Sequence, residues 1–217
     1  MCAGGNSEEI KYRHIWGEGC YTRPDIMLVL MNPTARNRTA HPDYQGTRLP
    51  FAGIKAFWKV LVEADLLPQS LLEDFADRDW NEERTRRVIA TLNQEKLYVT
   101  NLVKCVSARA ADPGAAEINY GLSVLQREIE LVQPRYIVAF GLLVFRAITG
   151  QTLKLGDYLA RLESGETGLE SRYYSIALNE INYPVFPCYF PTGRGNSRAA
   201  TACLRLLNKN LRSIKQC

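Results

Sequence analysis

Short apolar runs constrain the fold of this chain more than any other feature of its sequence. Ile26–Met31 (IMLVLM) is a continuous apolar segment, and Leu97–Asn101 (LYVTN) and Tyr136–Phe140 (YIVAF) are two further strand candidates. A continuous apolar run of this length is typical of a strand buried on both faces of a parallel sheet. Such a sheet needs helices on both of its faces.

Segments with helical spacing of apolar residues separate these strands. The spacing predicts helices over 54–64, 82–92, 112–133, 142–149 and 198–215, with a short helix over 70–77. Two more strands are predicted over 173–178 and 184–189, and a charged, glycine-containing stretch over 150–171 is predicted to be an irregular insertion. This alternation predicts an α/β fold: a three-layer α/β/α domain around a short, mainly parallel sheet of about four strands.

The composition fits one globular domain. The chain has 217 residues, of which 46% are hydrophobic and 23% charged, and this excludes disordered and fibrous classes. We expect a single domain over 1–217, with 1–24 as an N-terminal extension. No apolar run approaches the roughly 18–20 residues of a membrane helix, and the polar start is unlike a signal peptide, so we expect a soluble, intracellular protein without membrane contact. The formal charge of +4 permits an anionic partner without requiring one.

The six cysteines lie far apart in the chain. No CxxC or HxxxH pair is present, so the spacing predicts neither a zinc site nor a redox motif. We expect reduced thiols and no metal.

Ligands of parallel sheets bind beyond the carboxyl ends of the strands, so the residues that follow each strand are the candidate site. Asn32 and Asn101 each end an apolar strand. Taken singly, each asparagine is explained by turn geometry. Taken together at one edge, they would suit the polar edge of a flat heterocycle or the positioning of a water molecule. Phe51 is a candidate stacking face, with an ordinary core phenylalanine as the alternative.

A glycine-rich turn, Thr192–Ser197, precedes the last helix. Backbone amides and a helix N-terminus favour an anion such as phosphate, and this basic helix adds cations nearby. The alternative is a tight turn that caps a solvated helix.

Several catalytic arrangements are missing. His14 and His41 lie in polar stretches away from the strand ends, so a nucleophile has no obvious histidine base. No Walker loop or complete dinucleotide fingerprint is present. Any reaction here must need little acid–base help.

Five segments together resemble one family. MLVLMNPT (Met27–Thr34) resembles the first motif of the uracil-DNA glycosylase superfamily. LPFAGIKAFWKVLVEADLL (Leu49–Leu67) is similar to its mismatch-specific uracil/thymine branch, and YVTNLVKC (Tyr98–Cys105) to its thermostable branch. IVAFG (Ile137–Gly141) resembles the third strand, and VFPCYFPTGRGNS (Val185–Ser197) occupies the place of the final DNA-wedge motif.

The resemblance implies a role for each of these positions. Asn32 would orient the attacking water, Phe51 would stack on an extruded base, and Asn101 would read the edge of that base. Phe190, which stands where many members have a histidine, would also lie at the base. The DNA grip would come from the wedge residues Thr192, Arg194, Asn196 and Ser197.

These roles imply a monofunctional DNA glycosylase. It would flip a deaminated or mismatched base out of the helix, uracil above all, and leave an abasic site. Its partner would be damaged DNA, bound by a monomer inside the cell, in the cytoplasm and associated with the nucleoid if the source is a prokaryote. Cys105 matches a cluster ligand of the thermostable branch, but paired N-terminal cysteines are missing, so we expect no iron–sulfur cluster and no cofactor.

Two other readings stay open. One is a catalytically silent relative that binds nucleic acid through its basic wedge and arginine-rich loop. The other is an α/β protein that binds free nucleotides or nucleosides.

Overall fold

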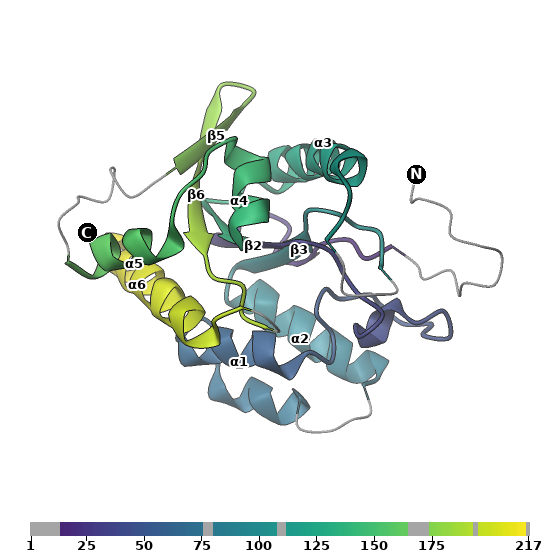
Figure 1. The fold of residues 1–217 in the computed structure, drawn as a ribbon. Coiled ribbons are helices and arrows are strands. Elements are labelled where there is room, and N and C mark those ends of the chain that lie inside the picture. Colours follow the sequence, from purple (N-terminus) through teal and green to yellow (C-terminus); the bar gives the residue numbers. More distant parts are fainter. Residues whose placement is uncertain (1–13, 76–79, 108–111, 165–173, 193–194, 216–217) are drawn as a thin grey trace.

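The computed structural model describes residues 14–75, 80–107, 112–164, 174–192 and 195–215. Over these residues the chain forms a six-stranded sheet with the order β1-β3-β2-β4-β6-β5 (Figure 1). The strands are β1 (Glu18–Gly19), β2 (Ile26–Leu30), β3 (Leu97–Asn101), β4 (Tyr136–Phe140), β5 (Tyr174–Leu178) and β6 (Ile181–Cys188). Strands β3, β2, β4 and β6 run parallel, whereas β1 and β5 pair antiparallel at the two edges. The predicted parallel core of about four strands is confirmed, and two edge strands extend it.

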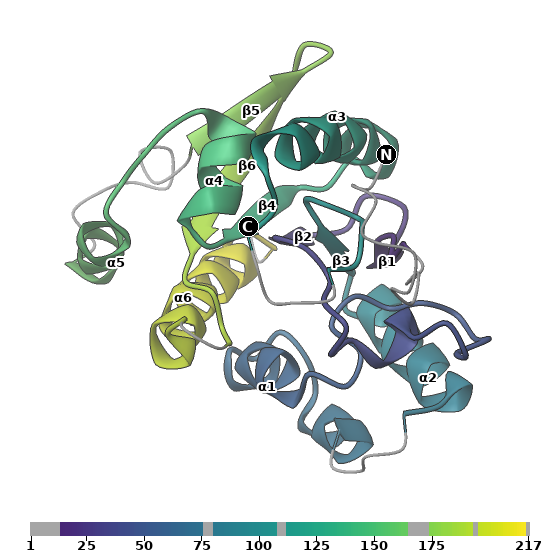
Figure 2. The same cartoon turned by 45° about the vertical axis from the view of Figure 1, so that its right-hand side comes forward.

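Helices cover both faces of the sheet. Helices α1 (Lys55–Glu63), α2 (Glu82–Gln94) and α6 (Ser197–Lys215) lie on one face, and α3 (Ala115–Val132) and α4 (Leu142–Thr149) lie on the other (Figures 1 and 2). Helix α5 (Leu155–Ser164) packs beside α6. Two 3-10 helices, η1 (Arg38–Ala40) and η2 (Gln69–Phe75), complete the described elements. The predicted three-layer α/β/α architecture is confirmed.

The central strands are apolar because both of their faces are buried. All five residues of β2 are buried, and successive side chains point to opposite faces. Leu28 belongs to the core that contains Phe57 of α1, whereas Val29 belongs to the core that contains Leu125 of α3.

The helix ends follow local signals. The Asn81 side chain accepts a hydrogen bond from the Arg84 amide at 2.9 Å and starts α2 at the predicted residue. Helix α3 begins at 115, slightly later than predicted, because the carboxylate of Glu117 accepts the Gly114 amide at 2.9 Å and so caps this end.

One predicted segment is wrong. The stretch over 150–171 was expected to be irregular, but 155–164 form α5. Tyr158 and Leu162, four residues apart, are buried on the same face of α5, and this apolar pair outweighs the charged residues around it. Residues 165–171 lie outside the described residues.

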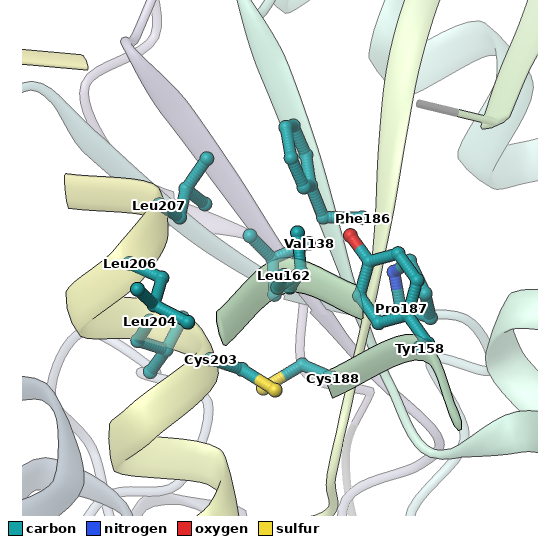
Figure 3. A pocket seen from close by; sticks show the side chains of 10 residues that line it. All are labelled: Val138, Tyr158, Leu162, Phe186, Pro187, Cys188, Cys203, Leu204, Leu206 and Leu207. Atoms are coloured by element: carbon teal, nitrogen blue, oxygen red, sulfur yellow. The ribbon is translucent and has the colours of Figure 1, made fainter. Parts of the chain in front are cut away.

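The cysteines differ from one another. Cys20, Cys188 and Cys203 are free, as expected, but Cys105 is disulfide-bonded, so the expectation of reduced thiols is wrong for it. The thiols of Cys188 and Cys203 face each other beside a cavity of about 10 Å³ between β6 and α6 (Figure 3). Burial raises the pKa of Cys188. This cavity holds at most about one water molecule and is too small for a base.

None of the helices in the described part of the chain is long and apolar enough to cross a membrane.

Candidate active site

The carboxyl ends of β2 and β3 bring two asparagines to the same edge of the sheet. The two strands are parallel, with Leu30 opposite Asn101. The Leu102 amide donates to the Leu30 carbonyl at 2.7 Å, which extends the pairing past the last residue of each strand. Asn32 follows two residues after Leu30 and is half-buried.

Asn101 has a buried carboxamide without a hydrogen-bond partner among the residues that the structure describes. Its side chain is 0% exposed, and neither Oδ1 nor Nδ2 forms a hydrogen bond with any atom in the described part of the chain. Asn37, which is equally buried, donates from Nδ2 to the Leu49 carbonyl at 3.0 Å and accepts the Thr39 amide at 3.0 Å. An unsatisfied buried polar group costs roughly 1–3 kcal/mol, so the polar edge of a ligand at Asn101 would recover this free energy.

Aromatic rings lie on the same face of the sheet as Asn101. Val99 and Leu30, which flank Asn101 on its face, belong to the core that contains Phe51. The ring of Phe51 lies 4.7 Å from that of Phe57 and 6.4 Å from that of Phe190, the latter edge to face. The chain thus brings together two of the predicted base-binding aromatics from distant segments.

The backbone of Phe51 is held in a left-handed conformation, with φ of 61°. A bulky residue in this region is strained, and the surrounding structure must maintain it. The Phe51 carbonyl accepts hydrogen bonds from Trp58 Nε1 at 3.0 Å and from the Ile54 amide at 2.9 Å. Both donors come from the start of α1, so this helix fixes the position of the ring.

Gly195 lies close to Thr192 and Phe190 just before α6. The Gly195 amide donates to the Thr192 carbonyl at 2.9 Å, and a Cβ at Gly195 would clash with the Phe190 carbonyl. The absence of a side chain at Gly195 is therefore what lets the turn close beside Phe190.

The predicted DNA-contacting residues have different environments. Asn196 caps α6, because its Oδ1 accepts the Ala199 amide at 3.0 Å, so this oxygen serves the fold. Ser197 is exposed at the first position of α6, and Thr192 is half-buried. Arg194 lies outside the described residues.

The long loop after β2 is anchored and exposes two arginines. Arg36 and Arg38 are exposed, and the Arg38 amide donates to the Ala52 carbonyl at 3.0 Å, next to Phe51. On the α2 side, Glu82 accepts the Thr47 amide at 2.6 Å. The loop therefore presents the positive charge of Arg38 next to the segment that carries Phe51.

A buried ionic network lies behind Asn101, on the α3 face. Lys104 Nζ donates to Thr100 Oγ1 at 2.6 Å, to the Asn101 carbonyl at 2.7 Å and to Glu128 at 2.5 Å. Tyr98 donates its hydroxyl to the same Glu128 at 2.8 Å. Burial lowers the pKa of Lys104, and the charge of Glu128 opposes this shift. Burial, with Glu128 second, raises the pKa of Tyr98 well above its usual value.

Sequence reasoning did not single out this network, although a signal was available. Lys104 directly follows the apolar pair Leu102–Val103, and Glu128 lies beside Ile129 on the apolar stripe of α3. A cation and an anion at positions of core character predict a buried pair.

The described residues do not fit an iron–sulfur cluster or another bound metal. Among them, no group of three histidine, cysteine or acidic side chains is arranged to hold a metal ion. Cys105, at the position of a cluster ligand in the thermostable branch, is disulfide-bonded and so supplies no thiolate.

Two comparisons place this chain among known proteins. It is similar to a Type-4 uracil-DNA glycosylase of Sulfurisphaera tokodaii, with 28% identity over 126 residues. That match covers 58% of this chain and 49% of the relative, so it spans about half of the relative's length. The model of the uracil DNA glycosylase superfamily matches residues 16–215. Because this match runs from the first edge strand through the last helix, the chain belongs to the uracil DNA glycosylase superfamily.

Proposed function

We propose that this protein is a monofunctional DNA glycosylase that hydrolyses the N-glycosidic bond of a deaminated or mismatched base, uracil above all. The observation that carries the proposal is the buried, unpartnered carboxamide of Asn101 on the same face of the sheet as Phe51. Membership of the superfamily and the name of the Type-4 relative support it.

The carboxamide of Asn101 matches the edge of uracil. Uracil offers a donor at N3 and an acceptor at O4, and a carboxamide has one acceptor oxygen and a donor nitrogen. A base inside a duplex cannot reach this buried group, so the enzyme would flip the nucleotide out at a cost of a few kcal/mol. Phe51 and Phe190 would contact the flipped base and recover part of that cost.

Water would be the nucleophile. Asn32, half-buried at the end of β2, would orient the water that attacks the sugar carbon once the glycosidic bond has largely broken. The leaving base carries negative charge and needs preorganised donors more than a strong base. Lys104 is not a candidate nucleophile, because its three N–H groups all donate to protein oxygens.

The DNA backbone would be gripped at two places. The exposed start of α6 at Ser197 favours a phosphate through its amides and its dipole, with Thr192 and Arg194 from the preceding turn. Arg36 and Arg38 would supply the second contact, on the Phe51 side.

The preferred base and the branch are part of this proposal. Thr34 and Phe190 replace the final glycine of the first motif and the frequent histidine of the wedge motif. The segment 49–67 resembles the mismatch-specific branch, whereas the matching relative is a Type-4 enzyme. The test must therefore include both deaminated bases and a mismatch.

The experiment is an excision panel. Purified protein is incubated with duplexes that contain uracil, hypoxanthine, xanthine or a G·T mismatch, and abasic sites are then cleaved with alkali. We expect strand cleavage with uracil and none with an undamaged duplex. DNA binding without cleavage of any duplex would instead indicate a silent relative. Affinity for a nucleoside without a dependence on salt would indicate a small-molecule binder.

A further inference from the structure

The peptide group that follows Asn101 is held at both of its ends. Its carbonyl accepts a hydrogen bond from Lys104 Nζ at 2.7 Å. Its N–H, which belongs to Leu102, donates to the Leu30 carbonyl at 2.7 Å. The carbonyl is therefore bonded to a buried cation, and the N–H is bonded to the strand that leads to Asn32.

Lys104 is itself fixed in place. Its side chain is 4% exposed, and its ammonium group also donates hydrogen bonds to Thr100 and Glu128. Thr100 Oγ1 accepts from Lys104 and donates to Glu128 at 3.0 Å, which closes a ring of three polar groups. Hydrogen bonds to charged groups are stronger than neutral ones, so this ring holds the ammonium group more firmly than a single contact would.

Helix α3 is seated close enough to supply Glu128 because of Gly121. A Cβ at this position would meet the Leu102 carbonyl oxygen at 2.5 Å. The absence of a side chain at Gly121 lets α3 lie against the same short stretch of main chain that follows Asn101.

The opposite face of this stretch carries the carboxamide of Asn101. Because neither of its polar atoms has a partner within the described ranges of the chain, hydrogen bonds of the side chain do not set its position. The main chain, which is held from the α3 face by the bonds to Lys104 and Leu30, fixes the point from which the side chain extends. A displacement of about 1 Å at a reacting or recognition group can lower a rate about 10²-fold.

We propose that Lys104 and Glu128 are positioning residues for base selection. They hold the main chain of Asn101, so that its carboxamide stands at one fixed depth beside Phe51 and accepts one base shape over others. This role rests on the proposed glycosylase function. A purely structural ion pair would stabilise the fold and leave base selection unchanged.

The test uses a double variant with a matched control. Removal of Lys104 alone would leave Glu128 buried without its cation and would threaten folding. The variant is therefore Lys104→Met with Glu128→Gln, which removes both charges and keeps an acceptor for Tyr98 and Thr100. The control is Leu125→Ala on the same helix, which opens a cavity in the α3 core and leaves the bond from Lys104 to Asn101 intact.

Two measurements are made on each full-length protein. The first is the ratio of kcat/KM for uracil to kcat/KM for the next best base of the panel, with affinity for an abasic duplex measured alongside. The second is hydrogen exchange of the Leu102 amide, which does not depend on activity.

We expect the ratio of kcat/KM for uracil to kcat/KM for the next best base to fall about tenfold in the double variant. This is less than the roughly 10²-fold loss that misplacement of a group can cause. The affinity for an abasic duplex should stay within about twofold. The Leu102 amide should exchange faster in the double variant than in Leu125→Ala. The Leu125→Ala variant should keep the wild-type ratio of kcat/KM values. An unchanged ratio in the double variant, or an equal fall in the control, would overturn the positioning role. If the wild type excises no base, the proposed function is wrong, and so is the proposed role of Lys104 and Glu128 in base selection. In that case the exchange rate still decides whether Lys104 anchors the peptide.

Discussion

The ring of Phe190 meets the ring of Phe51 edge to face, with their centroids 6.4 Å apart. Phe190 follows strand β6, and Phe51 precedes helix α1. In the proposed function these two rings would contact the flipped base, and neither ring offers a hydrogen-bond donor to it.

Replacement of Phe190 by histidine should therefore raise uracil excision. A donor to the developing charge of the leaving base contributes about 1.5–3 kcal/mol, which corresponds to a roughly 10- to 100-fold faster single-turnover rate. Phe190→Leu, which removes the ring and adds no donor, is the control and should slow excision. A rate for Phe190→His at or below that of the wild type would remove Phe190 from the base site.

The Asn32→Ala variant should lose excision by about 10²- to 10⁴-fold, because the water that attacks the sugar is no longer oriented. DNA affinity should stay within a few fold, since this side chain acts on water and not on phosphate. Single-turnover kinetics and binding to an uncleaved duplex separate the two effects. Asn182→Ala, an exposed change on β6, is the control. Equal losses of excision rate and DNA affinity in Asn32→Ala would contradict the proposal that Asn32 orients the attacking water.

Asn101→Asp should change which base is accepted. Burial favours the neutral acid, whose O–H can donate to N3 of cytosine while its carbonyl accepts from the N4 amino group. We expect the ratio of cytosine to uracil excision to rise at least about tenfold, the effect of one matched pair of hydrogen bonds, about 1.4 kcal/mol. A competition assay with both bases measures it. A preserved ratio would place Asn101 away from the base edge.

Arg38→Ala should reduce the salt dependence of DNA binding. If Arg38 contacts one phosphate, the slope of log affinity against log salt should fall by about 0.9. Arg135→Ala, an exposed arginine at the amino end of β4 and so at the opposite edge of the sheet, should leave the slope unchanged. Equal slopes for Arg38→Ala and the wild type would exclude that contact.

Periodicity was sufficient to predict the sheet core and most helices. The residues of β2, β3 and β4 are apolar because both of their faces are buried, and this leaves an unambiguous pattern. The edge strand β1 has two residues and no pattern of its own, since only its pairing with β3 defines it. Helix α5 was missed because its buried pair, Tyr158 and Leu162, stands among charged residues.

The candidate site was partly predictable for a related reason. Strand ends identify Asn32 and Asn101, because parallel strands carry their carboxyl ends to one edge. The unpartnered state of Asn101 and the left-handed backbone of Phe51 depend on contacts between distant segments, which no local pattern encodes. The bond from Lys104 to the Asn101 carbonyl is local, but Lys104 is also held by Glu128, which comes from the distant helix α3.

Glu82 should make the stability of this protein depend on pH. It accepts hydrogen bonds from the Thr47 amide at 2.6 Å, from the Tyr44 hydroxyl at 3.1 Å and from Arg86 Nε at 2.6 Å. Burial alone would raise the pKa of this carboxyl, but these hydrogen bonds outweigh burial and lower the pKa below 4.5. The folded protein therefore binds this proton less readily than the unfolded chain does.

A lowered pKa in the folded state gives stability that is present above the unfolded value of 4.5 and is lost as the pH falls through the folded value. Glu82→Gln should lower the free energy of unfolding at neutral pH by about 1 kcal/mol, in the range of one hydrogen bond, and should flatten its decline below 4.5. Urea unfolding across this pH range measures both effects. The control is Glu83→Gln, which removes an exposed carboxylate paired with Arg87. Its free energy of unfolding should fall with pH as that of the wild type does. An equally steep decline in Glu82→Gln would show that Glu82 does not anchor the loop that carries Arg38.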